Sequence, residues 1–212
     1  MKITKFEHSC LLVEMPEPVN RTVLFDPGVM SEEALNVNRL GYLDDIFITH
    51  EHPDHLSINL IKKLVSKFPE VRITTTNSIK QQLNVEGISA SAEVSEGIEF
   101  FDSPHEGHLP MFNPPEEVGI HYLKLLSHPG DSHSFKETRE ILALPVTAPW
   151  GSTDRAVQLA LELKPKYIIP IHDWHWKDEV RIDMYKRLET LFENDGIKFF
   201  KVETGKPIVI EV

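Results

Sequence analysis

The sequence has little of what holds secreted or membrane proteins together. It contains a single cysteine, Cys10, so no internal disulfide can form. It has no apolar run of the roughly 18 residues that a membrane-spanning helix needs. The first residues carry neither a long apolar stretch nor a small-residue cleavage site, so they predict no secretory signal. Together these absences predict a cytoplasmic protein with no membrane partner.

Positive charge is also scarce. The 22 lysines and arginines are outnumbered by 33 aspartates and glutamates, which leaves a formal net charge of −11. Such a surface repels the phosphate backbone of DNA and RNA. We therefore expect a small-molecule substrate and no nucleic acid. The charge leaves the oligomeric state open, a homo-oligomer included.

Nothing in the sequence marks a boundary between domains. No Gly/Ser linker, charge block or fixed-period repeat divides the 212 residues. A chain of this length can bury one large core. We therefore predict a single domain over residues 1–212.

Short β-branched runs alternate with amphipathic segments along the chain. Strands are expected over residues 2–6, 10–14, 21–25, 45–49, 71–75, 91–94, 97–102, 119–125, 140–144, 167–171, 199–202 and 208–212. Helices are expected over residues 56–68, 78–83, 153–163 and 181–193. This order predicts an α/β protein in which sheets pack together under a cover of helices.

The densest group of metal-binding side chains is His50-Glu51-His52-Pro53-Asp54-His55. It follows the apolar run 45–49 directly. In a loop, His50 and His52 can point to one side and bind one metal, while Asp54 and His55 face a second. Imidazole and carboxylate suit Zn²⁺, and also Mn²⁺ or iron. A histidine-rich surface loop is the alternative, but four ligand-type residues within six positions favour a metal site.

The pattern HxHxDH at these positions resembles the metallo-β-lactamase superfamily. Four further segments resemble that family's motifs and occur in its order. They are Leu24–Gly28, whose aspartate ends a strand, Pro104–His108, Pro129–Ser132 with its Gly-Asp turn, and Ile169–His172. The resemblance implies a four-layer αββα sandwich of two mixed β-sheets flanked by helices. The segment His8-Ser9-Cys10 is most similar to the branch of ascorbate-6-phosphate lactonase-like proteins.

The resemblance also implies a ligand set for two divalent metal ions. The first ion would be held by His50, His52 and His105. The second would be held by Asp54, His55 and His172. Asp131 would bridge the two ions.

Three of these positions have alternatives. His108 lies three residues beyond His105, which we favour because it closely follows an expected strand. His175 competes with His172, which ends an apolar strand. For Asp131, the alternative is an ordinary Pro-Gly-Asp turn residue.

Other polar and aromatic residues have two readings each. Asp26 is either a partner that orients a ligating histidine or the first residue of a Pro-Gly turn. His8 lies either at the edge of the pocket, as the lactonase-like branch implies, or in a turn between strands. Three tryptophans either wall a substrate pocket or pack elsewhere: Trp150, Trp174 and Trp176.

The resemblance implies hydrolysis of a small anionic substrate. Two divalent ions about 3.5–4 Å apart share a water and lower its pKa to about 7. Asp54 or Asp131 would be catalytic, by orienting that water or accepting its proton. A lactone, ester or amide is the first substrate class. The alternatives are a small-molecule or nucleotide phosphodiesterase and a metal-binding protein without catalysis.

Overall fold

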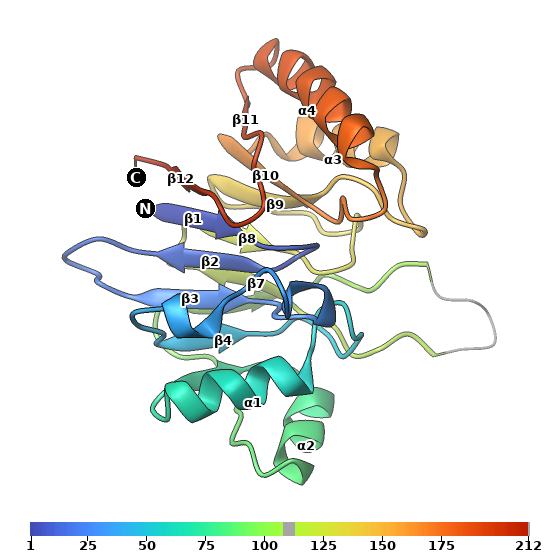
Figure 1. Cartoon of the computed structure of the whole chain (residues 1–212). Coiled ribbons are helices and arrows are strands. Elements are labelled where there is room, and N and C mark those ends of the chain that lie inside the picture. Colours follow the sequence, from blue (N-terminus) through green and yellow to red (C-terminus); the bar gives the residue numbers. More distant parts are fainter. Residues whose placement is uncertain (108–112, 212) are drawn as a thin grey trace. The chain divides into compact units, whose positions relative to one another are not determined.

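The computed structural model describes residues 1–107 and 113–211 (Figure 1). The chain forms two compact units. The first unit comprises Met1–Ser95, Pro115–Glu117 and Glu203–Val212. The second comprises Glu96–Pro114 and Val118–Val202. Each unit is built on one six-stranded sheet. The expected single domain over residues 1–212 stays a prediction.

The sheet of the first unit has the strand order β12-β1-β2-β3-β4-β5. Its strands are β1 (Lys2–Lys5), β2 (Leu11–Glu14), β3 (Thr22–Phe25), β4 (Asp45–Phe47), β5 (Arg72–Thr74) and β12 (Pro207–Val209). β2 is antiparallel to β1 and β3, whereas β4 is parallel to β3 and β5. Consequently β1, β3, β4 and β5 all run in one direction and end at the same edge of the sheet.

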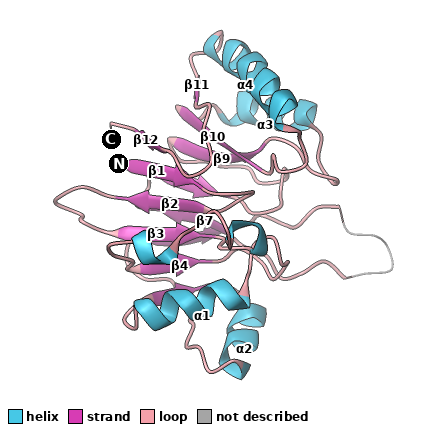
Figure 2. Cartoon of the chain, in the orientation of Figure 1, coloured by secondary structure: helices cyan, strands magenta, loops and turns pink. Residues whose placement is uncertain are grey.

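Two helices cover this sheet, α1 (Ile58–Lys67) and α2 (Asn77–Val85) (Figure 2). Helix α1 begins after Ser57, whose side chain accepts the N–H of Leu60 as an N-cap. The helix therefore begins two residues later than the predicted residue 56. Its buried face packs on the sheet in one apolar core, whose fully buried members include Leu24, Ile46, Ile48, Leu60, Ile61 and Leu64. Two short 3₁₀ turns, Val29–Ser31 and Val37–Arg39, precede β4.

The sheet of the second unit has the order β11-β10-β9-β8-β7-β6. Its strands are β6 (Ile98–Phe101), β7 (Gly119–Tyr122), β8 (Leu126–His128), β9 (Ile141–Pro145), β10 (Tyr167–Ile171) and β11 (Lys198–Phe199). β7 is antiparallel to both neighbours, and the pairs from β8 to β11 are parallel. Hence β6, β8, β9 and β10 end at one edge of the sheet.

Helices join the parallel strands from β9 to β11. Helix α3 (Thr153–Leu163) connects β9 to β10, and α4 (Asp178–Glu193) connects β10 to β11. Ser152 caps α3 by accepting the N–H of Arg155, and the helix ends at Lys164 in the left-handed conformation, directly before Pro165. In the described part of the chain, no helix has the length and apolar character of a membrane span.

The α/β class with two mixed sheets and flanking helices is confirmed, but two predicted strands are wrong. Residues 91–94 form only an isolated bridge between Ser91 and Thr74. The hydroxyl of Ser91 accepts the N–H of Glu93 instead, which turns the backbone away from a ladder. Residues 119–125 are interrupted by a turn at Leu123 and Lys124, both at positive φ (51° and 56°). Such turns usually carry Asn or Gly, so the Leu-Lys pair concealed the start of β8.

Candidate metal centre

In the first unit, Asp26 gathers three hydrogen-bond donors. It follows β3 directly, and its carboxylate accepts the Thr49 N–H at 2.8 Å and the Thr49 hydroxyl at 2.8 Å. His55 Nδ1 lies 2.7 Å from the same carboxylate. All three side chains are fully buried. The contact arises because the parallel strands β3 and β4 end side by side, with Phe25 opposite Phe47. Asp26 is thus positioned to orient a histidine. This is one of the two roles that the sequence suggested for Asp26.

Thr49 determines which nitrogen of His50 carries the proton. A hydroxyl has one hydrogen, and Thr49 donates it to Asp26. The hydroxyl therefore accepts from His50 Nδ1, at 3.1 Å. Glu117 Oε1, also buried, lies 3.5 Å from the same Nδ1. The lone pair of His50 is consequently on Nε2. In the same way, Asp26 takes the Nδ1 proton of His55 and leaves the lone pair on its Nε2.

The spacing of the imidazole nitrogens fits a bound metal ion. His50 Nε2 lies 3.2 Å from His52 Nδ1. Two ligand atoms about 2.0–2.1 Å from a tetrahedral Zn²⁺ are themselves about 3.3 Å apart. Two nitrogen lone pairs at this distance repel each other unless a proton or a cation lies between them. The pair therefore suits two adjacent corners of a metal coordination shell.

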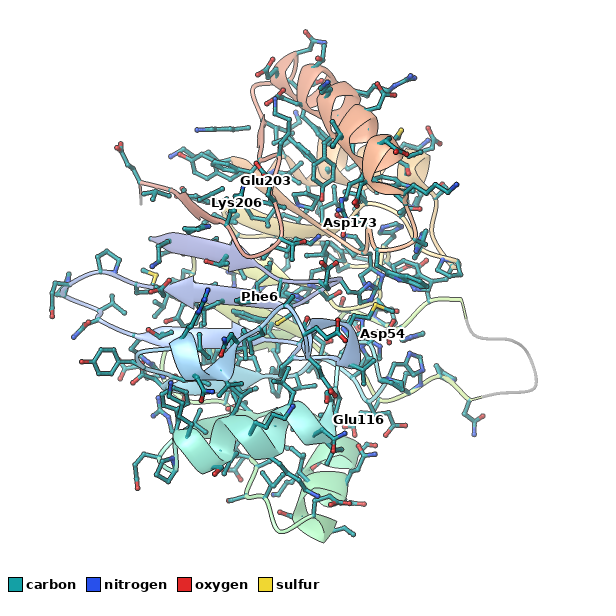
Figure 3. The ribbon with its side chains drawn as sticks, viewed as in Figure 1. Phe6, Asp54, Glu116, Asp173, Glu203 and Lys206 are labelled. Atoms are coloured by element: carbon teal, nitrogen blue, oxygen red, sulfur yellow. The ribbon has the colours of Figure 1, made fainter. Side chains whose placement is uncertain are left out.

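Asp54 contacts His8, which lies outside the histidine cluster. The Oδ2 of Asp54, the residue labelled in Figure 3, is 3.1 Å from His8 Nε2. The His8 ring also packs edge-on against His55, with the ring centres 5.1 Å apart. His8 follows β1, which ends at the same sheet edge as β3 and β4. Gly28 supports this arrangement, because a Cβ there would lie 1.8 Å from the carbonyl oxygen of Asp54.

In the second unit, Asp131 faces two of the expected histidine ligands. Its Oδ1 lies 2.6 Å from His172 Nε2, and its Oδ2 lies 3.6 Å from His105 Nε2. The three residues follow β8, β10 and β6, whose ends share one edge of the sheet. A carboxylate that turns one oxygen toward each of two histidines has the geometry that bridging two metal ions requires. The role of Asp131 as a metal ligand stays a prediction.

Three further contacts fix the loops that carry these residues. The backbone N–H of Glu106 donates to the Asp131 carbonyl at 3.0 Å. The Glu106 carboxylate accepts the His133 N–H and the Ser134 hydroxyl, both at 2.7 Å. The loops that contain His105 and Asp131 are therefore held together. Sequence reasoning gave Glu106 no role, since a glutamate between two candidate histidines carries no signal of a partner about 25 residues away.

The backbone at His172 adopts a left-handed conformation, with φ at 62°. Such a conformation is uncommon outside glycine and needs support from its surroundings. The next residue, Asp173, is fully buried (Figure 3) and accepts a hydrogen bond from the Tyr185 hydroxyl of α4. Arg181, also of α4, lies 3.9 Å from it. Helix α4 thus secures the bend that aims His172 toward Asp131.

The other histidines have different surroundings. His175 is exposed as a residue, and the partial burial of its ring lowers its pKa. Its Nε2 lies 3.4 Å from the Thr147 hydroxyl. His121, on β7, stacks on Phe101 and contacts the Ser127 hydroxyl at 2.9 Å, and burial lowers its pKa. His172, not His175, therefore meets Asp131. His108 lies outside the described residues.

Comparisons with known proteins give one consistent result. The family model described as "Beta-lactamase superfamily domain" matches residues 2–172. Protein Rv0786c of Mycobacterium tuberculosis is 28% identical over 207 residues, which cover 92% of this chain and 94% of that protein. A metal-dependent hydrolase of Nanoarchaeum equitans is 26% identical over 198 residues, covering 83% and 85%. The solved structure of Igni18, a metallo hydrolase of Ignicoccus hospitalis, superposes with a TM-score of 0.73 at 18% identity, covering 100% of this chain and 98% of that one.

Proposed function

The chain belongs to the metallo-β-lactamase superfamily, and on this premise we propose that it hydrolyses a small anionic substrate with two bound divalent metal ions. The chain is a metal-dependent hydrolase of this superfamily's type, in keeping with the names of its Nanoarchaeum and Ignicoccus relatives. The number of ions, their identity and the substrate are our proposals.

The ligand set that we propose is the one expected from the sequence. His50, His52 and His105 would hold one ion. Asp54, His55 and His172 would hold the other, and Asp131 would bind both. The observation that carries the proposal is the Asp131 carboxylate, which turns Oδ1 toward His172 and Oδ2 toward His105. A set with this many imidazoles favours Zn²⁺, with Mn²⁺ and iron as alternatives.

The hydrogen bonds described above prepare this set for a cation. Thr49 and Asp26 take the Nδ1 protons of His50 and His55, so both rings present the Nε2 lone pair that a metal requires. Neither histidine must then rearrange before it binds.

The chemistry that the bound ions supply is a water of lowered pKa and a polarised substrate oxygen. Asp54 is the residue that we assign to accept the proton of that water. Its Oδ2 lies 3.1 Å from His8 Nε2, so a proton taken up there can be shared with a buried imidazole. This assignment gives His8 a role in proton transfer.

A lactone, ester or amide is the substrate class that we propose. The test is a panel of lactones and p-nitrophenyl esters, with bis-p-nitrophenyl phosphate as the phosphodiester. Enzyme stripped by a chelator is reloaded with Zn²⁺, Mn²⁺ or Fe²⁺, and bound metal is counted by mass spectrometry. Turnover of the phosphodiester alone would show that the proposed substrate class is wrong. Bound metal without turnover of any substrate would show that the proposed hydrolysis is wrong.

Variants of the histidine cluster test the ligand set. His52→Ala should release metal and abolish hydrolysis. Asp54→Ala should keep much of the first metal while losing most of the activity. The matched control is His175→Ala, which removes an exposed imidazole and should leave metal content and turnover unchanged. Two equivalents of metal and normal activity in His52→Ala would overturn the assignment.

A further inference from the structure

Trp150 contacts the segments of the second unit that carry the expected ligands. Its indole Nε1–H donates to Asp131 Oδ2 at 2.9 Å. Its ring packs edge-on against His172, with centres 5.5 Å apart and planes at 65°. Its Cβ lies over Gly107, two residues after His105, where any added Cβ would come within 1.8 Å of it. Trp150 therefore touches Asp131 and His172 directly and packs on the loop that bears His105.

The hydrogen bond to Asp131 decides how the carboxylate is turned. The terminal torsion of an aspartate is broad, so the carboxylate rotates unless donors fix it. The indole N–H is a donor only. It uses one lone pair of Oδ2, the oxygen that faces His105, and the second lone pair of that oxygen can bind a cation. Oδ1 is then turned toward His172 at 2.6 Å.

The indole also contacts His133. The two rings pack edge-on with centres 5.0 Å apart. His133 is fully buried, and its Nε2–H donates to the Pro145 carbonyl at 2.7 Å. A Cβ at Gly151 would lie 2.8 Å from the His133 ring, so glycine at this position lets the imidazole approach. The indole therefore packs against two imidazoles, and these contacts restrict how its ring can turn.

From these contacts we infer that Trp150 is a positioning residue of the metal centre: its indole N–H sets the carboxylate of Asp131 in the orientation that binds metal. The inference rests on the proposed function, because it assumes that Asp131 is a ligand. Tryptophan is required at this position for its N–H as well as for its ring. Hydrogen-bond partners of metal ligands typically change metal affinity about 10- to 100-fold when they are removed.

The test compares Trp150→Phe with Trp176→Phe. The first keeps an aromatic ring beside the two imidazoles and removes the N–H. The second removes another half-buried indole of the same unit. We expect Trp150→Phe to bind Zn²⁺ about 10- to 100-fold more weakly in competition with a chromophoric chelator. At saturating Zn²⁺, kcat should fall while KM changes less than about twofold, because a turned carboxylate alters the reaction and not substrate binding. Trp176→Phe should match the wild type in both measurements.

A second measurement needs no folded Trp150 variant. The protein has three indole N–H groups, and the spectra of Trp174→Phe and Trp176→Phe identify the remaining resonance as that of Trp150. This proton should exchange slowly with solvent in the metal-free protein and shift as Zn²⁺ is added. Rapid exchange with no shift would overturn the inference, as would equal Zn²⁺ affinity in Trp150→Phe and Trp176→Phe. Failure of the proposed function would appear differently, as a wild type that binds no metal.

Discussion

Replacing Thr49 with valine removes one hydroxyl from the centre of the first unit's hydrogen-bond network and nearly preserves the shape of the side chain. The hydroxyl donates to Asp26 at 2.8 Å and accepts from His50 Nδ1 at 3.1 Å. All three residues are fully buried, so water cannot replace the lost partner. The backbone N–H of Thr49 still donates to Asp26 in the variant.

The expected magnitudes follow from these two hydrogen bonds. A hydrogen bond to a charged group contributes about 1.5–3 kcal/mol, and a buried donor left without a good partner costs about 1–3 kcal/mol. Because the new methyl group gains some burial, we expect the free energy of unfolding of the metal-free protein to fall by about 3 kcal/mol. His50 also loses the contact that fixes its tautomer, so Zn²⁺ affinity should fall about 10- to 100-fold.

Thr75→Val provides the matched control. Thr75 is equally buried, and its hydroxyl donates to a neutral acceptor, the Ile48 carbonyl, at 2.9 Å. Loss of this neutral hydrogen bond should cost about 1 kcal/mol and leave Zn²⁺ affinity unchanged. Urea unfolding of chelator-treated protein measures the stability of both variants, and chelator competition measures their affinity for Zn²⁺.

The comparison has a clear negative result. If Thr49→Val binds Zn²⁺ as tightly as Thr75→Val does, the hydroxyl does not set the His50 tautomer. If the two variants also lose equal stability, the contact with Asp26 is no stronger than an ordinary buried hydrogen bond. Either finding would refute the reasoning that links Asp26 through Thr49 to the metal ligands.

Three further predictions concern other parts of the molecule. Burial raises the pKa of Cys10 from 9.0 to about 12. At pH 8 about one thiol in ten thousand is then ionised, so the native protein should resist alkylation, whereas the protein unfolded in urea should react fully. Burial lowers the pKa of His121, whereas the Glu137 carboxylate raises it; imidazole NMR should give a pKa below 6.5, and Glu137→Gln should lower it further. Gly28→Ala should destabilise the protein by about 3 kcal/mol in urea unfolding and weaken Zn²⁺ binding, because the added Cβ would collide with the carbonyl of Asp54. Unchanged stability would show that the backbone at Gly28 can shift at little cost in free energy.

Much of the fold is predictable because hydrophobic periodicity is a local property. Helix α3 and strand β10 were predicted with the bounds that the structure has, since each is an uninterrupted amphipathic or apolar run between clear stop signals. Prediction failed where side chains compete with the backbone pattern. Ser91 makes a turn within an apparent strand, and the Leu123-Lys124 turn has none of the usual turn residues.

The sequence by itself determined where side chains of ligand type are densest. Four ligand-type side chains follow an apolar strand within six residues, and that local pattern needs no tertiary information. Only the tertiary structure decided which partners orient the expected ligands. Asp26 contacts Thr49 and His55, and Trp150 contacts Asp131, at sequence separations of 19 to 29 residues. These contacts exist because strands that run in one direction end at the same edge of their sheet, and strand order is set by the packing of the whole unit.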